Sequence, residues 1–285
     1  MAVELALSAR SLARHGISPE NLQELPSATG VYIFHSDRAM PLYIGKSVNI
    51  RSRVLSHLRE PEEARMMAQA RRVTWTRTAG EIGALLLESQ LIKSQQPLYN
   101  KKLRRSRELC AWKLDLSQGE TSPTLVYSRD VDFATTSCLF GLYTSATAAK
   151  SFLIEVAQEH GLCLGVLGLE AIGKRGCFGL QLRRCHGACV GGESALLHGH
   201  RVHLALQRSQ VRSWPFPGAV GLVERDGAWV QTHVVRNWRH EQTLETLAPD
   251  AVLLPMADFE FDLDAYRILV KPLLDGGCEM VHLAG

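Results

Sequence analysis

The sequence predicts an α+β protein in which a small antiparallel sheet flanked by helices is followed by a cysteine-rich α+β domain. In the first hundred residues, short apolar and aromatic runs predict the strands and segments of helical periodicity predict the helices. Four cysteines then gather in a glycine-rich, aperiodic stretch between residues 163 and 189. We expect an N-terminal extension over 1–24, a first domain over 25–103 and a C-terminal domain over 104–285.

Composition places the chain among globular proteins. Of its 285 residues, 46% are hydrophobic and 21% are charged, which excludes collagen-like, coiled-coil and largely disordered chains. No apolar run reaches the roughly 18 residues of a membrane span, and Met1–Arg14 lacks the pattern of a signal peptide. We therefore expect a cytoplasmic protein without membrane contact, whose seven cysteines are thiols or metal ligands rather than disulfides.

The charge is divided unevenly along the chain. Residues 1–107 hold 17 Lys and Arg against 9 Asp and Glu, a balance of +8, whereas residues 108–285 hold 15 against 20, a balance of −5. A polyanion such as nucleic acid is the natural partner of the basic third, and the alternative is a solvated charge run at a domain junction. The candidate nucleic-acid contacts are five clustered cations: Lys101, Lys102, Arg104, Arg105 and Arg107.

The first two apolar runs predict a β-hairpin. Gly30–His35 and Pro41–Gly45 are separated by a polar loop of about five residues. A symmetric loop would place Tyr32 opposite Tyr43, and opposed residues of antiparallel strands share a face, so the two phenols should lie side by side. A third strand is expected at Arg72–Arg77.

A helix is expected directly after the hairpin. Ser47 can cap its start, and the periodic pattern runs to Arg59. Arg53 and His57, one turn apart, are expected on the side away from the core. The residues expected on the buried face are Val48, Val54, Leu55 and Leu58.

A longer helix is expected from Glu81 to Gln95, ended by Pro97. At about 100° per residue, Glu88 falls on the apolar stripe that should face the core. A buried carboxylate costs several kcal/mol unless a cation, a metal ion or a donor meets it. We therefore expect such a partner for Glu88, the alternative being a side chain that reaches solvent or pairs with a nearby arginine.

Weaker patterns predict the remaining elements. Asp226–Gly227 is a strong signal for the turn of a second hairpin. No motif assigns a role to Trp214–Gly285, which we expect to support the cysteine-rich domain or to contact a partner. The other expected elements are short strands between Cys110 and Tyr143, helices at Ala146–His160, Ala195–Arg212 and Phe261–Leu274, and hairpin strands at Ala219–Arg225 and Trp229–Arg236.

The motifs of the first hundred residues resemble a known family. Gly30-Val31-Tyr32, ten intervening residues and Tyr43-Ile44-Gly45 are similar to the signature of the GIY-YIG endonucleases. The resemblance is strongest to the N-terminal nuclease domain of bacterial excinuclease C, in Leu42–His57 and Leu85–Asn100. Further positions that match the family's spacing are Lys46, Asn49, Arg53, Glu88 and Asn100.

The resemblance implies a metal-dependent DNA endonuclease and gives each residue a role that fits phosphodiester hydrolysis. Glu88 would be the protein ligand of one Mg²⁺ or Mn²⁺ ion. Tyr32 or Tyr43, with Tyr43 favoured, would act as general base once nearby cations lower its pKa. Arg53, assisted by Lys46, would clamp the phosphate.

Three further positions complete the expected site. Asn100 would hold the site together by hydrogen bonds, and Gly45 would let the backbone approach the ion or the substrate. His57 stands where excinuclease C usually has tyrosine, and because imidazole titrates near neutrality we expect activity with a lower pH optimum. The plain alternatives are a surface residue for His57 and ordinary strand aromatics for the tyrosines.

Four cysteines are the candidate ligands of a second metal centre. Converging thiolates in a cytosolic protein suggest zinc or an iron–sulfur cluster, although the spacings lack the paired gaps of common zinc ribbons. The surrounding sequence resembles the cysteine-rich region of excinuclease C, which implies a [4Fe–4S] cluster, with zinc or four buried thiols as alternatives. Cations between the cysteines could also face a phosphate backbone. The candidate ligands are Cys163, Cys177, Cys185 and Cys189.

The resemblance covers residues 22–200, and we expect the chain to be too short for the further domains of excinuclease C. A shorter homologue is implied, which makes one 3′ incision beside a bulky lesion in nucleotide excision repair. It would act as a monomer on damaged double-stranded DNA, recruited by the excinuclease B subunit after loading by the A subunit. The alternatives are a structure-specific or restriction-like nuclease, a non-catalytic metal-containing nucleic-acid-binding protein, and a redox sensor.

Overall fold

The computed structural model describes residues 15–100, 108–246 and 261–283. Within these residues the chain forms two compact units, and both combine helices with small antiparallel sheets, which confirms the α+β class. The first unit joins the described residues before 101 to those of 216–246 and 262–283, and the second contains 108–215 with Phe261. The sequence had suggested one C-terminal domain over 104–285; instead, its last part packs on the N-terminal unit.

The first sheet has the order β2-β1-β3, formed by β1 (Gly30–His35), β2 (Pro41–Ser47) and β3 (Arg72–Arg77). The expected pairing of Tyr32 with Tyr43 is wrong. Tyr32 lies opposite Gly45 and Tyr43 opposite Phe34, because the loop offsets the register by one residue and a bulge between Phe34 and His35 offsets it by one more. The shift is an even number of residues, so both phenols still occupy the same face of the sheet.

Three helices surround this sheet and carry most of its core contacts. They are α2 (Pro19–Gln23), α3 (Ile50–His57) and α5 (Glu81–Gln95), and the last has the predicted bounds. A shorter turn pair, η1 (Pro61–Glu63) and α4 (Ala64–Met67), connects α3 to β3.

The expected buried face of α3 is confirmed for Val54 and Leu58 and wrong for Val48 and His57. Asn49 rather than Ser47 caps this helix, since the Asn49 side chain accepts from the Ser52 N–H at 2.9 Å. Val48 therefore lies before the helix, whose buried residues are Ile50, Val54 and His57. Val48 is therefore 62% exposed, whereas His57 is only 1% exposed.

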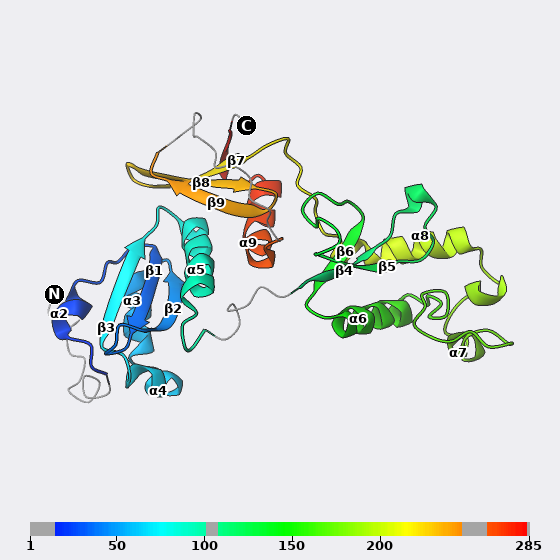
Figure 1. Ribbon diagram of the computed structural model, residues 1–285, viewed down its shortest axis with the longest axis horizontal. Helices are drawn as coiled ribbons and strands as arrows, with labels where there is room; N and C mark the ends of the chain where they lie inside the picture. Colours follow the sequence, from blue (N-terminus) through cyan, green and yellow to red (C-terminus); the bar gives the residue numbers. More distant parts are fainter. Residues whose placement is uncertain (1–14, 101–107, 247–260, 284–285) are drawn as a thin grey trace. The chain divides into compact units, whose positions relative to one another are not determined.

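The second sheet of this unit has the order β10-β7-β8-β9 and packs with α9 against α5, as Figure 1 shows. The hairpin turn is Gly227–Ala228, one residue later than expected, because Asp226 still pairs with Trp229. The elements are β7 (Val220–Asp226), β8 (Trp229–Arg236), β9 (Arg239–Leu244), α9 (Leu263–Leu274) and β10 (Glu279–His282).

The second unit is built on a sheet of order β5-β4-β6 covered by α6 and α8. The Trp112 indole N–H donates to the Ala149 carbonyl at 3.0 Å and ties the sheet to α6. None of the helices among the described residues is long and apolar enough to cross a membrane. The elements are β4 (Cys110–Lys113), η2 (Leu116–Gln118), β5 (Thr124–Tyr127), β6 (Leu139–Tyr143), α6 (Ala146–Glu159), α7 (Phe178–Gln181), η3 (Ala188–Val190), α8 (Ala195–Leu206) and η4 (Gln207–Ser209).

Candidate active site and thiol cluster

Three aromatic side chains meet where β1 and β2 pack on α3. The ring centroids of Tyr32 and Tyr43 lie 6.2 Å apart, and each ring lies 5.4 Å from the His57 imidazole. Tyr32 is fully buried, whereas Tyr43 is half-buried. The structure thus brings the two predicted phenols together with His57, a predicted site residue that the helical pattern had placed on the side away from the core.

A hydrogen-bonded series runs from the buried Tyr32 phenol to a partly exposed carboxylate. The Tyr32 hydroxyl lies 2.5 Å from Nε2 of His57, and Nδ1 of His57 contacts the Glu63 carboxylate. With Glu63 as acceptor, Nδ1 carries the proton and Nε2 is free to accept from Tyr32. Sequence reasoning missed Glu63, whose only signal was its place in the acidic turn that follows α3.

Gly45 makes room for the phenols. A Cβ atom at this position would lie 2.4 Å from the Tyr32 hydroxyl and 2.7 Å from a ring carbon of Tyr43. We had expected the missing side chain to admit an ion or the substrate. The structure gives a different reason, which is that any larger residue would push apart the two rings of the site.

Burial raises the pKa of both tyrosines above the ordinary value. Desolvation is the main cause for each, and the nearby Arg53 guanidinium lowers both pKa values but does not offset it. The expected depression of a tyrosine pKa by these side chains is therefore absent. Neither phenol is ionised at neutral pH in the protein alone, so a base at this site must pass its proton onward.

Glu88 lies on α5 beside β2. Burial raises the pKa of its carboxyl, and the Lys46 backbone N–H donates to Oε1 at 3.0 Å, which supplies the expected donor. Among the described residues no cationic side chain pairs with Glu88, because the Lys46 ammonium contacts Glu81 at the start of the same helix. The Glu88 carboxylate is half-buried, and one of its oxygens has no hydrogen bond to any described residue. Such an oxygen suits a hard divalent cation.

Asn100 fixes the edge of β2. Its side-chain oxygen accepts from the Ile44 N–H, and its side-chain nitrogen donates to the Ile44 carbonyl, both at 2.8 Å. This pair of bonds replaces a missing strand partner next to Tyr43. The five cations expected to contact nucleic acid, at positions 101, 102, 104, 105 and 107, lie outside the described residues.

The helix that carries Glu88 receives its N-terminal cap from a distant segment. Gly80, at the N-cap position of α5, offers no side chain. The Glu224 carboxylate on β7 accepts instead from the Ile82 and Gly83 N–H groups at 2.8 and 2.7 Å, and Nε2 of His233 lies 3.0 Å from it. These bonds outweigh burial and hold the pKa of Glu224 below its ordinary value. The C-terminal segment is thereby tied to the Glu88 helix.

Replacing Glu224 by alanine should lower the free energy of unfolding of the first unit by about 2–3 kcal/mol, since two amide donors and one imidazole lose a buried acceptor. Urea denaturation followed by far-UV circular dichroism measures the change. Asp226→Ala is the matched control, because Asp226 pairs with Arg77 between the same two segments but is half exposed. Equal stability losses in the two variants would contradict the capping role.

The four predicted cysteines converge in the second unit. The sulfur of Cys177 lies 3.7 Å from that of Cys163 and 3.6 Å from that of Cys185. The sulfurs of Cys163, Cys177 and Cys189 all lie within 4.8 Å of one another and could hold a metal ion. Cys177 is a helix N-cap, and its sulfur accepts from the Leu180 N–H.

Comparison with known proteins gives three matching family models, one after another along the chain. They are a UvrC-like GIY-YIG domain over 28–101, the UvrC/Cho excinuclease middle domain over 109–208 and the excinuclease Cho C-terminal domain over 219–285. The excinuclease Cho proteins of Shigella flexneri and of Escherichia coli strain K12 are each 49% identical over 264 residues, which cover 92% of this chain and 88% of the relative.

A solved structure also matches the first segment. It is the GIY-YIG N-terminal endonuclease domain of UvrC from Thermotoga maritima, bound to its catalytic divalent cation, magnesium. The match has 31% sequence identity and a TM-score of 0.27, and it covers 28% of this chain and 92% of that chain.

Proposed function

Because the chain belongs to the excinuclease Cho family, we propose that it makes the 3′ incision beside bulky lesions in nucleotide excision repair. It acts on damaged double-stranded DNA and is recruited by the excinuclease B subunit after loading by the A subunit. The observation that supports this best is the convergence of Tyr32, Tyr43, His57 and Glu88 from four elements on one site. A domain that had only kept the fold would have no need of this set.

Glu88 would hold one Mg²⁺ or Mn²⁺ ion, which when bound supplies a Lewis acid for the scissile phosphate. The chain's own residues handle the proton. Tyr43, the more accessible phenol, would take the proton of the attacking water and pass its own to Tyr32, whose ring centroid lies 6.2 Å from that of Tyr43. Tyr32 in turn passes a proton to Nε2 of His57, and the resulting imidazolium faces Glu63.

Arg53 and Lys46 balance the charge that develops on the phosphate. The exposed Arg53 guanidinium interacts with both phenols, so it stands where a phosphate next to Tyr43 would lie. The Lys46 ammonium contacts the exposed carboxylate of Glu81. An exposed ion pair is weak, so Lys46 can exchange this partner for a phosphate. Because these cations are already in place before the reaction, they stabilise the negative charge of the pentacovalent transition state without any rearrangement of the protein.

The rate of incision should fall at acidic pH, because His57 becomes protonated and can no longer accept a proton. Burial lowers its pKa below the ordinary 6.5, partly offset by Glu63, so the imidazole is neutral and ready to accept a proton at pH 7. The rate should then be flat near neutrality and fall about tenfold per pH unit once the pH drops below the lowered pKa of His57. A pH–rate profile of single-turnover incision measures this.

The matched variant is His57→Tyr, which installs the tyrosine usual in excinuclease C. The variant should keep activity, and its rate should no longer show the fall at acidic pH (the acid limb of the profile) that is due to His57. An acid limb that persists unchanged in His57→Tyr would contradict a proton-accepting role for His57.

A defined-lesion duplex incubated with purified excinuclease A and B subunits tests the proposed function. One nick on the 3′ side, dependent on both subunits, is the expected result. Cutting of undamaged or branched DNA without them would instead identify a structure-specific or restriction-like nuclease.

The thiol cluster would hold a [4Fe–4S] group, for which four converging, mostly buried sulfurs are a fitting ligand set. Iron and acid-labile sulfide in anaerobically purified protein are the expected findings. One zinc ion per chain without sulfide would identify the alternative.

A further inference from the structure

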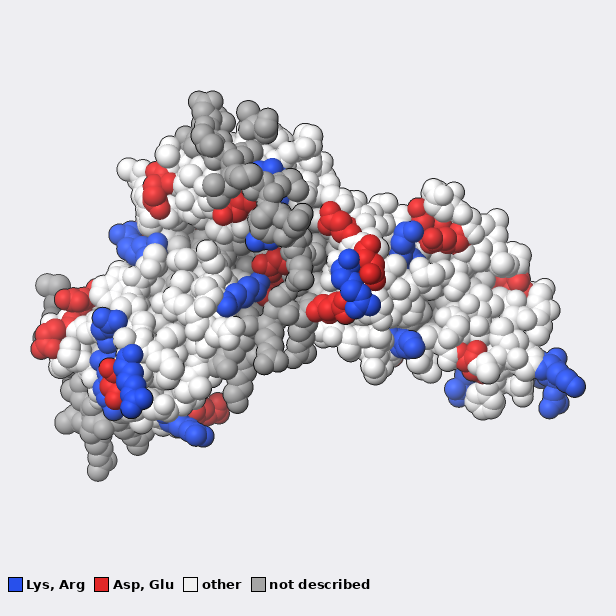
Figure 2. Space-filling view, viewed as in Figure 1, with Lys and Arg blue, Asp and Glu red and all other residues white. Residues whose placement is uncertain are grey.

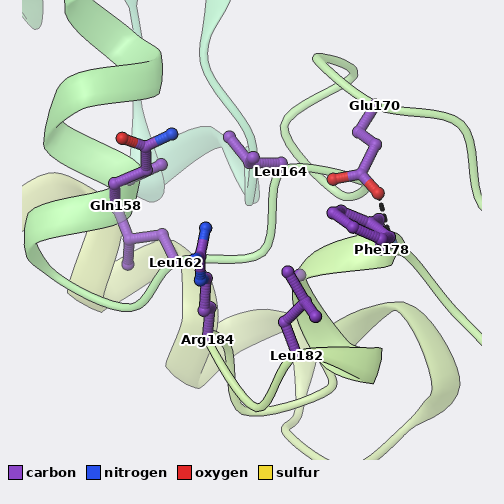
Figure 3. A pocket seen from close by; sticks show the side chains of 9 residues that line it. Gln158, Leu162, Leu164, Glu170, Phe178, Leu182 and Arg184 are labelled. Atoms are coloured by element: carbon purple, nitrogen blue, oxygen red, sulfur yellow. Dashed lines mark hydrogen bonds between the residues drawn. The ribbon is translucent and has the colours of Figure 1, made fainter.

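A hollow of about 210 Å³ lies beside the thiol cluster of the second unit. Its walls come from the C-terminal end of α6, the loop that carries Cys163, and α7 with the residues after it. Leu162, Leu164 and Leu182 make these walls apolar, and Figure 3 shows their side chains around the opening. The proposed nuclease chemistry uses none of these residues.

Polar groups enter the hollow at separate points. The Arg184 side chain reaches in between Leu162 and Leu182, and the Gln158 amide lies at another edge (Figure 3). The Glu170 carboxylate accepts from the Phe178 N–H and is held inside the wall. A carboxylate in the wall repels a phosphate, whereas the three groups together offer acceptors and donors to a planar, uncharged ring with hydrogen-bonding edges.

An exposed aromatic ring lines the hollow, and exposed cations lie within five residues of it in the sequence. Phe178 lines the hollow and is 62% exposed. Lys174, Arg175 and Arg183 are exposed, and no ion pair joins them to any described residue. Blue atoms are visible at the tip of the second unit beyond α7 in Figure 2. Proteins that hold single nucleic-acid strands combine these same two features, aromatic rings for the bases and cations for the backbone.

We propose that this hollow receives one unstacked base of a DNA strand, which lies against Phe178 while Lys174, Arg175 and Arg183, its neighbours in sequence, hold the adjacent phosphates. The proposal rests on the proposed function for its substrate, DNA. The hollow would be a second DNA contact outside the nuclease site. It would recognise a base that is no longer stacked in the duplex, whatever the DNA sequence. Such a contact favours DNA that is already distorted, because the energy of unstacking has been spent there.

Fluorescence anisotropy tests the contact with two duplexes that differ at one position. One carries a single bulged base and the other an abasic residue in its place. Binding is measured in the Glu88→Gln background, so that no cutting is needed and a failure of the proposed nuclease activity leaves this result readable. The parent protein should prefer the bulged base by about tenfold, the lower range for one stacked base.

Phe178→Ala should abolish the preference, and Phe178→Trp should restore it. Leu204→Ala is the control, since Leu204 is 65% exposed on α8 of the same unit and does not line the hollow. Lys174→Ala combined with Arg175→Ala should weaken binding of both duplexes equally and lower the salt dependence. No preference in the parent, or an undiminished preference in Phe178→Ala with unchanged thermal unfolding, would overturn the proposal. Loss of binding to the excinuclease B subunit alone would also overturn it.

Discussion

Glu88→Gln is expected to reduce 3′ incision by at least about a thousandfold, because it removes the negative charge that would bind the divalent ion. Glutamine keeps the size of the side chain and can still accept from the Lys46 N–H, which the carboxylate now does at 3.0 Å. The fold and the affinity for DNA should therefore remain. Single-turnover incision of a lesion duplex, with unfolding and binding measured in parallel, separates the loss of chemistry from a loss of structure.

The control for this variant lies on the same helix. Glu81→Gln removes an exposed carboxylate that contacts the Lys46 ammonium, so the helix and the net charge change in the same way. Incision by Glu81→Gln should stay within about threefold of the parent, as expected for a surface ion pair. A Glu88→Gln protein that cuts within tenfold of the parent would show that the ion is held elsewhere.

Cys177→Ser should cause the largest loss of stability in the second unit. Cys177 is fully buried and lies at the centre of the thiol cluster, within reach of two other sulfurs. The segment around it has few large buried side chains, so a bound metal centre would provide much of its folding energy, about 10 kcal/mol for structural zinc in small domains. Loss of the metal and a lower, broadened thermal transition are expected, measured by metal analysis and calorimetry.

Cys138→Ser is the control for the cluster. Cys138 is a half-buried residue of the same unit that is not part of the thiol cluster. The Cys138→Ser protein should keep both its metal content and its melting temperature. Equal effects of the two substitutions would mean that Cys177 contributes as a packed thiol rather than as a ligand.

The local patterns of the sequence predicted much of the first unit. The bounds of β3 and α5 are confirmed, and strand alternation and helical periodicity predicted the shared face of Tyr32 and Tyr43 and the core-facing position of Glu88, whereas only the family resemblance joined the three in one site. Such patterns depend on neighbouring residues only. They therefore predicted the shared face of Tyr32 and Tyr43 but not the residues opposite them, as the shifted register shows.

What the sequence did not predict depends on long-range contacts. Glu224 caps a helix that begins more than a hundred residues earlier in the chain, and no periodicity can report such a contact. Glu63 was missed because His57 was placed on the wrong face of α3, where Val48 had been counted in the buried stripe although it lies before the helix. The same error hid the hydrogen-bonded series from Tyr32 to Glu63.

The position of manganese in a crystal of the protein soaked in Mn²⁺ tests the central claim most directly. An anomalous difference peak within bonding distance of the Glu88 carboxylate, on the side of Tyr43 and Arg53, is the predicted result. A peak held by other carboxylates, with Glu88 still bound only to the Lys46 N–H, would contradict it.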